Sequence, residues 1–214
     1  MKVTKIGHCC LLVELGGLRI MTDPGRWTAG AHSTEKDIDV ILITHEHGDH
    51  LHVESLKTVV ANNTNAVVLT NADVGDILHA EGIPYTVVDD GDTHTVGDVL
   101  FESYDGPHEE IYGDFGIVHN TGYFIGGVLF YPGDAFTEPK KEVPVLALPV
   151  AGPWCTIKDA IDYAKRVRPT CAFPVHDGML RYPEVSINHA VRELPAANID
   201  FVPLADGDTH TFTV

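Results

Sequence analysis

The chain has 214 residues, and its 14 basic against 31 acidic side chains give a formal net charge of −17. This length is sufficient for one sizeable hydrophobic core. The acidic balance argues against nucleic acid as the usual partner, because proteins that bind a phosphate backbone concentrate lysine and arginine. It does not restrict small substrates, since bound divalent cations would dominate the local field.

No apolar run approaches the roughly 20 residues that are needed to cross a bilayer, and the first residues lack the features of a secretory signal. The cysteines form no CxxC pair and no dense framework; they are Cys9, Cys10, Cys155 and Cys171. Cys9 and Cys10 are expected to point to opposite faces of a strand and therefore not to bridge each other. These features predict a cytoplasmic protein with reduced thiols and no membrane contact.

Apolar runs and turn signals predict alternating groups of strands and helices. In chain order, strands are predicted at residues 3–6, 9–15, 18–22, 39–44, 66–70, 85–88, 99–104, 117–125, 127–131, 145–149, 171–175 and 201–204. Helical patterns cover residues 53–61, 72–80, 157–167 and 184–194. Mostly consecutive strands with interspersed helices, in two similar halves, favour two packed sheets with helices outside. No linker divides the chain, so a single domain is predicted over residues 1–214.

One short segment occurs twice: DGDTHT at residues 90–95 recurs at residues 206–211. Asp-Gly favours a tight turn, and Thr-His-Thr suits a polar strand face. Either an ancient duplication or two hairpins with the same turn chemistry explains the repeat. Its histidines, His94 and His210, are interpreted as solvated strand residues rather than ligands.

The most informative motif is THEHGDH at residues 44–50, directly after the apolar run at residues 39–43. His45 and His47 lie two apart in an extended segment, so both rings can face one cation. Gly48 permits a sharp turn that can aim Asp49 and His50 at a second cation, and paired hydrolytic cations typically lie about 3.5–4 Å apart. Structural zinc usually recruits thiolates, which are missing from this motif, so a site that retains water is favoured.

The motif resembles the HxHxDH signature of the metallo-β-lactamase superfamily. Further segments resemble its small single-domain branch, which includes the UlaG-like proteins and related metal-dependent hydrolases; they are IGHCCLLV at residues 6–13, IMTDP at 20–24, YPGD at 131–134 and PVH at 174–176. The resemblance covers essentially the whole chain. It implies an α/β fold, the four-layer αββα sandwich of the metallo-β-lactamase type.

The resemblance also implies a ligand set. The first metal would be held by His45, His47 and His108, and the second by Asp49, His50 and His176, with Asp134 bridging both. Asp23 would lie behind the ligands and orient one imidazole through its distal nitrogen. His119 competes with His108 but lies inside a strand pattern and ranks second, while His8 is equally compatible with a place beside the site and with an ordinary core position. His32, His52, His79 and His189 are interpreted as surface or helix residues.

The implied activity is metal-dependent hydrolysis of a small-molecule ester, lactone or phosphoester by a hydroxide that bridges two divalent cations. Asp134 or Asp49 would accept the proton. Zinc is expected first, with manganese or iron also compatible. Substrate contacts are expected from the loop residues Trp27, Tyr112, Trp154 and Arg181, and self-association would be usual for small members of this fold. Two alternatives remain open, a mononuclear iron dioxygenase similar to persulfide dioxygenases and a non-catalytic metal-binding protein.

Overall fold

The computed structural model describes residues 1–213, which form two seven-stranded sheets packed face to face. The first sheet has the order β14 (Thr209–Thr211), β1 (Lys2–Gly7), β2 (Cys10–Leu15), β3 (Leu18–Thr22), β4 (Val40–Leu42), β5 (Val67–Thr70) and β6 (Thr86–Val87). The second has the order β13 (Asp200–Phe201), β12 (Cys171–Val175), β11 (Val145–Pro149), β10 (Leu129–Tyr131), β9 (His119–Ile125), β8 (Val99–Pro107) and β7 (Thr93–Val96).

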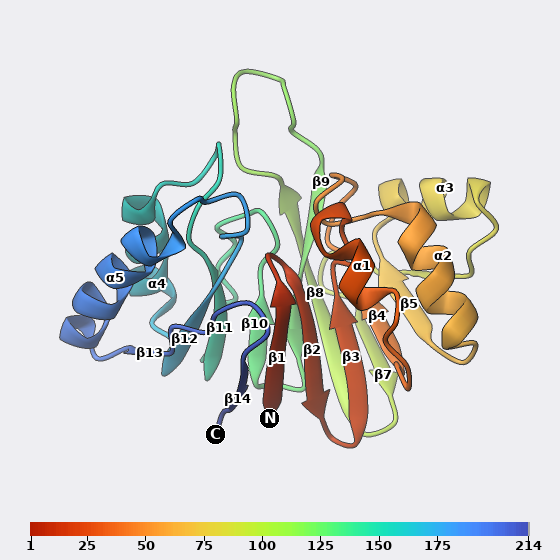
Figure 1. Cartoon of the computed structure of the whole chain (residues 1–214), viewed down its shortest axis with the longest axis horizontal. Helices are drawn as coiled ribbons and strands as arrows, with labels where there is room; N and C mark the ends of the chain where they lie inside the picture. Colours follow the sequence, from red (N-terminus) through yellow and green to blue (C-terminus); the bar gives the residue numbers. More distant parts are fainter. Residues whose placement is uncertain (214) are drawn as a thin grey trace.

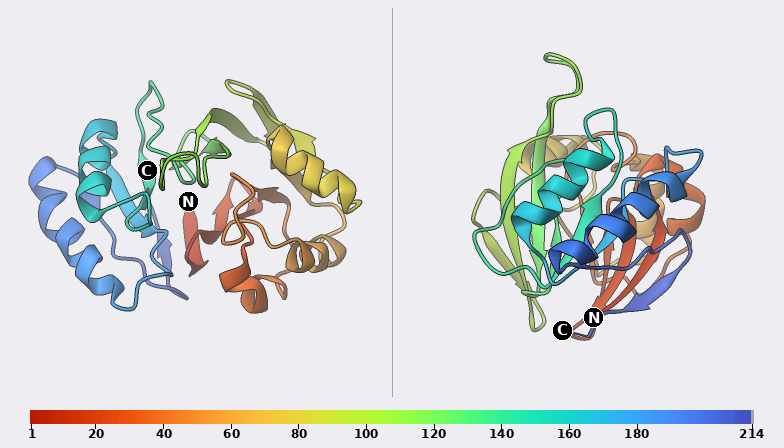
Figure 2. Two further views of the ribbon diagram at one scale, coloured as in Figure 1. Left: turned by 90° about the horizontal axis from the view of Figure 1, so that it is seen from above. Right: turned by 90° about the vertical axis from the view of Figure 1, so that its left-hand side faces the viewer.

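Helices cover the outer face of each sheet (Figures 1 and 2). Beside the first sheet lie α1 (Ala29–His32), α2 (Val53–Asn62) and α3 (Ala72–Ala80), and beside the second lie α4 (Ile157–Val167) and α5 (Pro183–Glu193). Short 3-10 turns occur at Arg26–Thr28 and Pro195–Ala197. The expected four-layer αββα sandwich is confirmed. No helix among the described residues is long and apolar enough to span a bilayer.

Strand alternation divides the buried side chains among three hydrophobic layers. In β2, Leu11 and Val13 enter the core between the two sheets, whereas Cys10 and Leu12 pack toward α2 and α3. Cys9 belongs to the core between the sheets, so Cys9 and Cys10 do face opposite sides, and the four cysteines are free thiols. A third core joins the second sheet to α4 and α5.

The repeated segment occupies equivalent places in the two halves. In residues 90–95, Gly91 N–H donates to Ser103 O and Ser103 N–H donates to Asp92 O. In residues 206–211, Gly207 N–H donates to Lys5 O and Lys5 N–H donates to Asp208 O. Each copy leads into an edge strand, β7 beside β8 and β14 beside β1. This equivalence favours duplication over a chance likeness of two turns.

Several predicted boundaries need correction. The strand expected from residue 9 begins at Cys10, and the one expected from residue 117 begins at His119. β8 continues to Pro107 because its residues 101–107 pair with β9. The helix α1 was not predicted, since a four-residue helix leaves no periodic signal. α4 follows the prediction closely, and it begins at a capping box formed by Thr156 and Asp159.

Candidate metal centre

The seven predicted ligands lie on connections at one end of the sandwich. Residues 45–50 follow β4 and lead to α2, His108 follows β8, Asp134 follows β10 and His176 follows β12. His45, His50, His108, Asp134 and His176 are buried, whereas His47 and Asp49 are partly exposed. The fold therefore brings together side chains that are up to 131 residues apart in sequence, with the cluster at residues 45–50 as the fixed centre.

The ligand atoms of His45 lie close to those of two different sets of residues. Ligand atoms of His45, His47 and His108 lie within 4.8 Å of one another, as do those of His45, His50 and Asp134. Asp134 Oδ2 lies 2.8 Å from His176 Nε2 and 3.3 Å from His108 Nε2, and Asp134 Oδ1 lies 3.1 Å from His50 Nε2. This carboxylate stands between the two halves of the predicted ligand set, as a bridging ligand requires.

Asp49 approaches the same place from the other side. Its Oδ2 lies 3.7 Å from His176 Nε2 and 3.9 Å from His50 Nε2. Two zinc-bound nitrogen or oxygen atoms are separated by about 3.4 Å in a tetrahedral site, so these separations suit donors around one cation. Asp49, His50 and His176 thus form a second ligand group beside the first, which consists of His45, His47 and His108.

The Nδ1 atom of each buried imidazole in the predicted ligand set makes a hydrogen bond within the protein. His50 Nδ1 donates to Asp23 Oδ2 at 2.7 Å, His108 Nδ1 to Glu109 O at 2.6 Å and His176 Nδ1 to Ala151 O at 2.6 Å. His45 Nδ1 donates to Thr44 Oγ1, whose own hydroxyl proton is given to Asp23 Oδ2. In the neutral ring, each bond fixes the tautomer in which Nε2 carries a lone pair.

Those lone pairs have no hydrogen-bond partner. Among residues 1–213, the buried side-chain atoms without one are His45 Nε2, His50 Nε2, His108 Nε2, His176 Nε2 and Asp134 Oδ1. Unpaired buried polar atoms are costly and uncommon, and here they all belong to one cluster of acceptors. A cation satisfies such a cluster, so the residues present fit bound divalent metal.

Asp23 lies behind the ligands and accepts four hydrogen bonds. Its Oδ1 accepts from Thr44 N–H, and its Oδ2 accepts from the Thr44 hydroxyl, from His50 Nδ1 and from the Tyr131 hydroxyl at 2.6 Å. Fully buried, it orients His50 directly and His45 through Thr44. The prediction assigned one imidazole to Asp23; the link through Thr44 and the tyrosine were missed, because neither leaves a local signal in the sequence.

The pKa values within the cluster move in opposite directions. Burial lowers the pKa of His45 and, less strongly, of His47. Burial also opposes the charged form of His50, yet the carboxylate of Asp134 raises the pKa of this imidazole well above its usual range. Asp134 is likewise buried, and the charges of His176 and His50 hold its pKa well below the usual range. The carboxylates therefore stay ionised and favour positive charge beside them.

The backbone around the site is held in uncommon conformations. His8, Asp23 and His176 have φ values of 51°, 36° and 59°, and each directly follows a strand. Left-handed φ in residues other than glycine costs energy and tends to occur at functional sites. Gly25 allows a close approach of a different kind, because a Cβ there would lie 1.6 Å from Asp49 O. The turn at Gly25 therefore packs directly against the backbone of the loop that carries Asp49.

A cavity of about 360 Å³ opens onto the centre. It is lined by the predicted ligands His47, Asp49, His108, Asp134 and His176 together with Arg26, Trp27, Gly48, Ile111, Pro153, Trp154 and Met179. Of the four loop residues expected to contact substrate, Trp27 and Trp154 line it and Tyr112 and Arg181 do not. A larger hollow of about 1030 Å³ near the Gly16-Gly17 turn contains no histidine or cysteine.

Trp154 also has a role that the sequence did not indicate. Its Nε1–H donates to Asp134 Oδ2 at 3.0 Å, so the indole fixes the carboxylate that stands between the two ligand groups.

The connection between β8 and β9 projects beyond the end of the sandwich (Figure 1). Ile111 on this connection lines the cavity, whereas Tyr112 is 83% exposed at its tip.

The remaining histidines separate clearly. His8 is buried beside the site and donates to Asp49, which decides the alternative left open for it. His119 lies 3.1 Å from Asp105 on the neighbouring surface and joins neither ligand group. His32 lies in a helix, as one of the expected positions, but it is fully buried between Thr28 and Ser55.

Comparison with known proteins identifies the family of the chain. The Beta-lactamase superfamily domain model matches residues 2–176. Protein Rv0786c of Mycobacterium tuberculosis is 32% identical, with 99% of this chain and 100% of the relative covered. A UPF0173 metal-dependent hydrolase of Carboxydothermus hydrogenoformans is 28% identical, with 82% and 84% covered. The structure of Igni18, a metallo hydrolase from Ignicoccus hospitalis, is 22% identical with a TM-score of 0.79, covers 100% and 98%, and shows the same fold. The chain therefore belongs to the beta-lactamase superfamily, among relatives that include UPF0173 metal-dependent hydrolases.

Proposed function

We propose that the protein is a hydrolase that holds two divalent cations, zinc first among them, and cleaves an ester, lactone or phosphoester bond of a small molecule. One observation carries the proposal. Four buried imidazole nitrogens without hydrogen-bond partners, each with its tautomer fixed from behind, converge on the carboxylate of Asp134. A structural zinc site normally contains thiolates and closes its coordination shell, whereas this centre opens into a cavity.

Different residues of the chain would bind each cation and orient the ligands. His45, His47 and His108 would hold one cation and Asp49, His50 and His176 the other, with Asp134 shared between them. Bound divalent cations supply water activated near neutral pH and polarise the oxygen of the bond to be cleaved. Asp23 and Trp154 hold the ligands in place, so little reorganisation is needed during the reaction.

Asp49 is better placed than Asp134 to take up a proton. Its side chain is 20% exposed against 3% for Asp134, so a proton on Asp49 can pass on to solvent. Burial opposes ionisation of Asp49, but the hydrogen bond from His8 and the charge of His50 hold its pKa below the usual value. His8 occupies Oδ2, which leaves Oδ1 as the acceptor.

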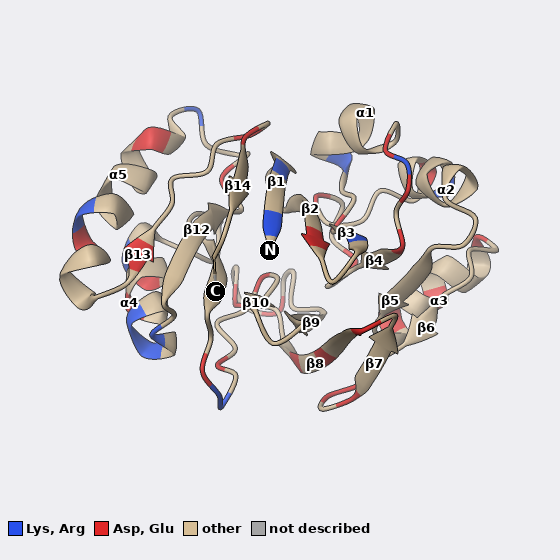
Figure 3. Cartoon of the chain, turned by 90° about the horizontal axis from the view of Figure 1, so that it is seen from below, with Lys and Arg blue, Asp and Glu red and all other residues tan. Residues whose placement is uncertain are grey.

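The cavity supports a small, partly apolar substrate. Its volume of about 360 Å³ lies within the usual range for small-molecule sites. Trp27, Ile111, Pro153 and Met179 form an apolar rim, and Arg26 offers one cation that can neutralise an anionic group. Basic residues are scattered over helices, strands and loops rather than gathered in a stripe (Figure 3), which supports a small molecule over nucleic acid. The free cysteines are in keeping with a cytoplasmic location.

The test begins with metal content. Protein purified without added metal should contain two zinc ions per chain, or gain them on reconstitution, and should hydrolyse 4-nitrophenyl acetate, a simple lactone or bis(4-nitrophenyl) phosphate. Chelation should abolish the rate, and zinc should restore it. His45→Ala should remove hydrolysis, whereas the matched variant His119→Ala, outside both ligand groups, should retain it.

The outcomes separate the alternatives. Turnover that is unchanged in His45→Ala would remove the assignment of this centre. A single iron per chain, with oxygen consumed in the presence of a persulfide, would replace hydrolysis by dioxygenation. Two tightly bound cations without turnover of any ester, lactone or phosphoester would favour the non-catalytic metal-binding protein.

A further inference from the structure

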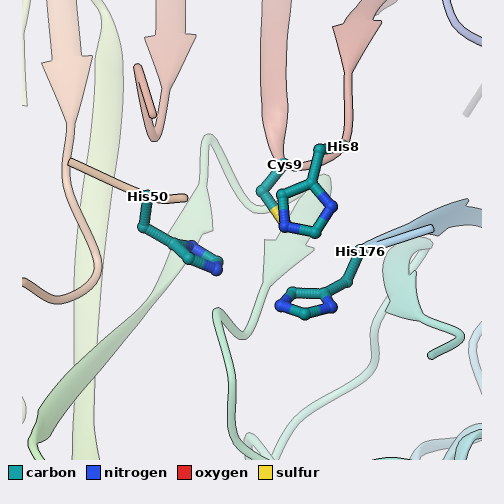
Figure 4. A group of neighbouring side chains, drawn as sticks. All are labelled: His8, Cys9, His50 and His176. Atoms are coloured by element: carbon teal, nitrogen blue, oxygen red, sulfur yellow. The ribbon is translucent and has the colours of Figure 1, made fainter. Parts of the chain in front are cut away.

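A thiol lies among the ligand atoms of the second group. Ligand atoms of His8, Cys9, His50 and His176 are all within 4.8 Å of one another. They come from three segments, the connection between β1 and β2, the loop after β4 and the end of β12. Figure 4 shows the four side chains directed toward a common point. The sequence assigned no role to Cys9 beyond that of a reduced thiol.

Hydrogen bonds exclude His8 as a fourth donor to a cation. Gly178 N–H donates to His8 Nδ1 at 3.2 Å, so this nitrogen carries the lone pair. His8 Nε2 therefore bears the proton, which it gives to Asp49 Oδ2 at 3.2 Å. Both nitrogens are occupied, and His8 acts as a positioning residue for Asp49.

The other three side chains remain available. His50 Nε2 and His176 Nε2 are buried lone pairs without a partner among the described residues. Cys9 is 2% exposed and follows directly on the strained residue His8, whose left-handed backbone conformation sets the direction of the turn. Cys9 lies in the turn before β2 and its thiol enters this group, whereas the thiol of Cys10, the first residue of β2, packs toward the helices.

We propose that Cys9 is a thiolate ligand of the second cation, in addition to Asp49, His50 and His176. This inference rests on the proposed function, because it requires that the cation binds. As the sulfur–metal bond forms, the thiol proton passes to bulk water. The ligand atoms of Cys9, His50 and His176 already lie within 4.8 Å of one another, so a cation that contacts all three requires only a small local contraction.

A thiolate would determine which metal the centre prefers. Manganese favours oxygen donors, whereas zinc and cobalt accept thiolate readily. Without Cys9 the second position offers nitrogen and carboxylate donors alone, which manganese and iron also accept. Cys9 thus makes the position selective for zinc, and replacing it should reduce the preference for zinc over manganese on the order of tenfold or more.

Cobalt substitution provides the test. Cobalt bound to a thiolate shows a sulfur-to-metal charge-transfer absorption in the near ultraviolet, which nitrogen and oxygen ligands do not give. Wild-type protein with two bound cobalt ions should show this absorption, and Cys9→Ser should lose it. Cys155→Ser is the matched control, because Cys155 is another buried thiol near the cavity but bonds to Pro149 O and Thr156 O. It should keep the absorption.

The possible results are decisive. Two bound cobalt ions without the absorption, or an absorption that persists in Cys9→Ser, would overturn the thiolate ligand and leave the hydrolase proposal intact. Protein that retains no cobalt would instead contradict the proposed function itself. If Cys9→Ser does not fold, the triple variant Cys10→Ser/Cys155→Ser/Cys171→Ser keeps Cys9 as the single thiol. It must retain the full absorption for the inference to stand.

Discussion

In both halves of the molecule, residues that follow corresponding strands surround the predicted metal centre, but these residues have opposite roles in the two halves. Both sheets have the same order counted from the edge strands β14 and β7. β1, β3 and β5 therefore correspond to β8, β10 and β12. His8 and His108 directly follow the first pair, and Asn71 and His176 directly follow the third. In the second pair, Asp23 directly follows β3, whereas two residues separate Asp134 from the end of β10.

In the second half, the strand ends carry predicted ligands and the connection after β11 supports them. Ala151 O accepts from His176 Nδ1, and Trp154 donates to Asp134. In the first half, the connection after β4 carries the ligands and the strand ends support it. Asp23 binds His50, and Asn71 Nδ2 donates to Thr44 O. Each half thus supplies what the other lacks, because the predicted ligands of one half are oriented by residues of the same half and meet those of the other half at Asp134.

The two aspartates in the connections after β3 and β10, Asp23 and Asp134, give the largest expected contrast. Asp134→Asn should reduce turnover on the order of 10⁴-fold, equal to about 5.5 kcal/mol, because the shared carboxylate is lost from both positions. Asp23→Asn makes the same change behind the ligands, so it should weaken metal affinity about 10- to 100-fold and recover much of the rate at saturating zinc. Kinetics and metal titration of both variants measure this. Equal losses that excess zinc does not relieve would contradict the division of roles.

The two strands that begin the halves differ at one buried position. Lys5 in β1 corresponds to Ser103 in β8, and its Nζ lies 2.6 and 2.7 Å from the carboxylate oxygens of Asp177, beside His176. Lys5→Met should reduce the free energy of unfolding by about 3–5 kcal/mol, because it leaves a buried carboxylate without its partner. Urea denaturation measures the loss.

The same strand supplies the control. Lys2 pairs with Glu14 at 2.7 Å, but both side chains are 46% exposed, so Lys2→Met should change stability by less than about 1 kcal/mol. Lys5→Met/Asp177→Asn should recover part of the loss, since no buried carboxylate is left unpaired; Asp206, 3.4 Å from Lys5 Nζ, is 55% exposed. Equal effects of Lys2→Met and Lys5→Met would show that the link between the halves contributes no special stability.

The third contrast concerns the connection after β3, which contains α1, whereas the connection after β10 contains no helix among the described residues. His32 in α1 is buried against Thr28 and Ser55, and burial lowers its pKa from 6.5 to about 4. Between these values the unfolded chain binds the proton more strongly. The stability contribution is therefore complete above about pH 6.5 and declines as the pH falls toward 4, by about 3 kcal/mol at most.

Unfolding measured across this pH range checks the prediction. His32→Gln keeps a side chain that can bond to both hydroxyls, and it should flatten the decline by about one proton. His189→Gln, at an exposed position of α5, should leave the wild-type curve unchanged. A wild-type slope in His32→Gln would show that other groups cause the acid sensitivity.

Predicted ligands that are neighbours in the sequence were easier to recognise than those that are far apart in the chain. Residues 45–50 announce a metal site because their side chains are neighbours in the chain and metal-competent in type. His108, Asp134 and His176 are isolated residues after strands; the resemblance to the family pattern assigned them as ligands, and their places in loops after buried strands were in keeping with it. His32 was placed in a helix or on the surface, since a single histidine gives no indication of the hydroxyls that surround it.

By itself, the sequence determined that two packed sheets carry helices outside and which chemical types gather after the strands, because side-chain periodicity and turn residues act over short distances. The tertiary structure decided which nitrogen of each imidazole faces the centre and that Trp154 holds Asp134. It also decided that Lys5 meets Asp177, a residue 172 positions away. Such contacts depend on how two sheets pack against each other, and no local pattern encodes that arrangement.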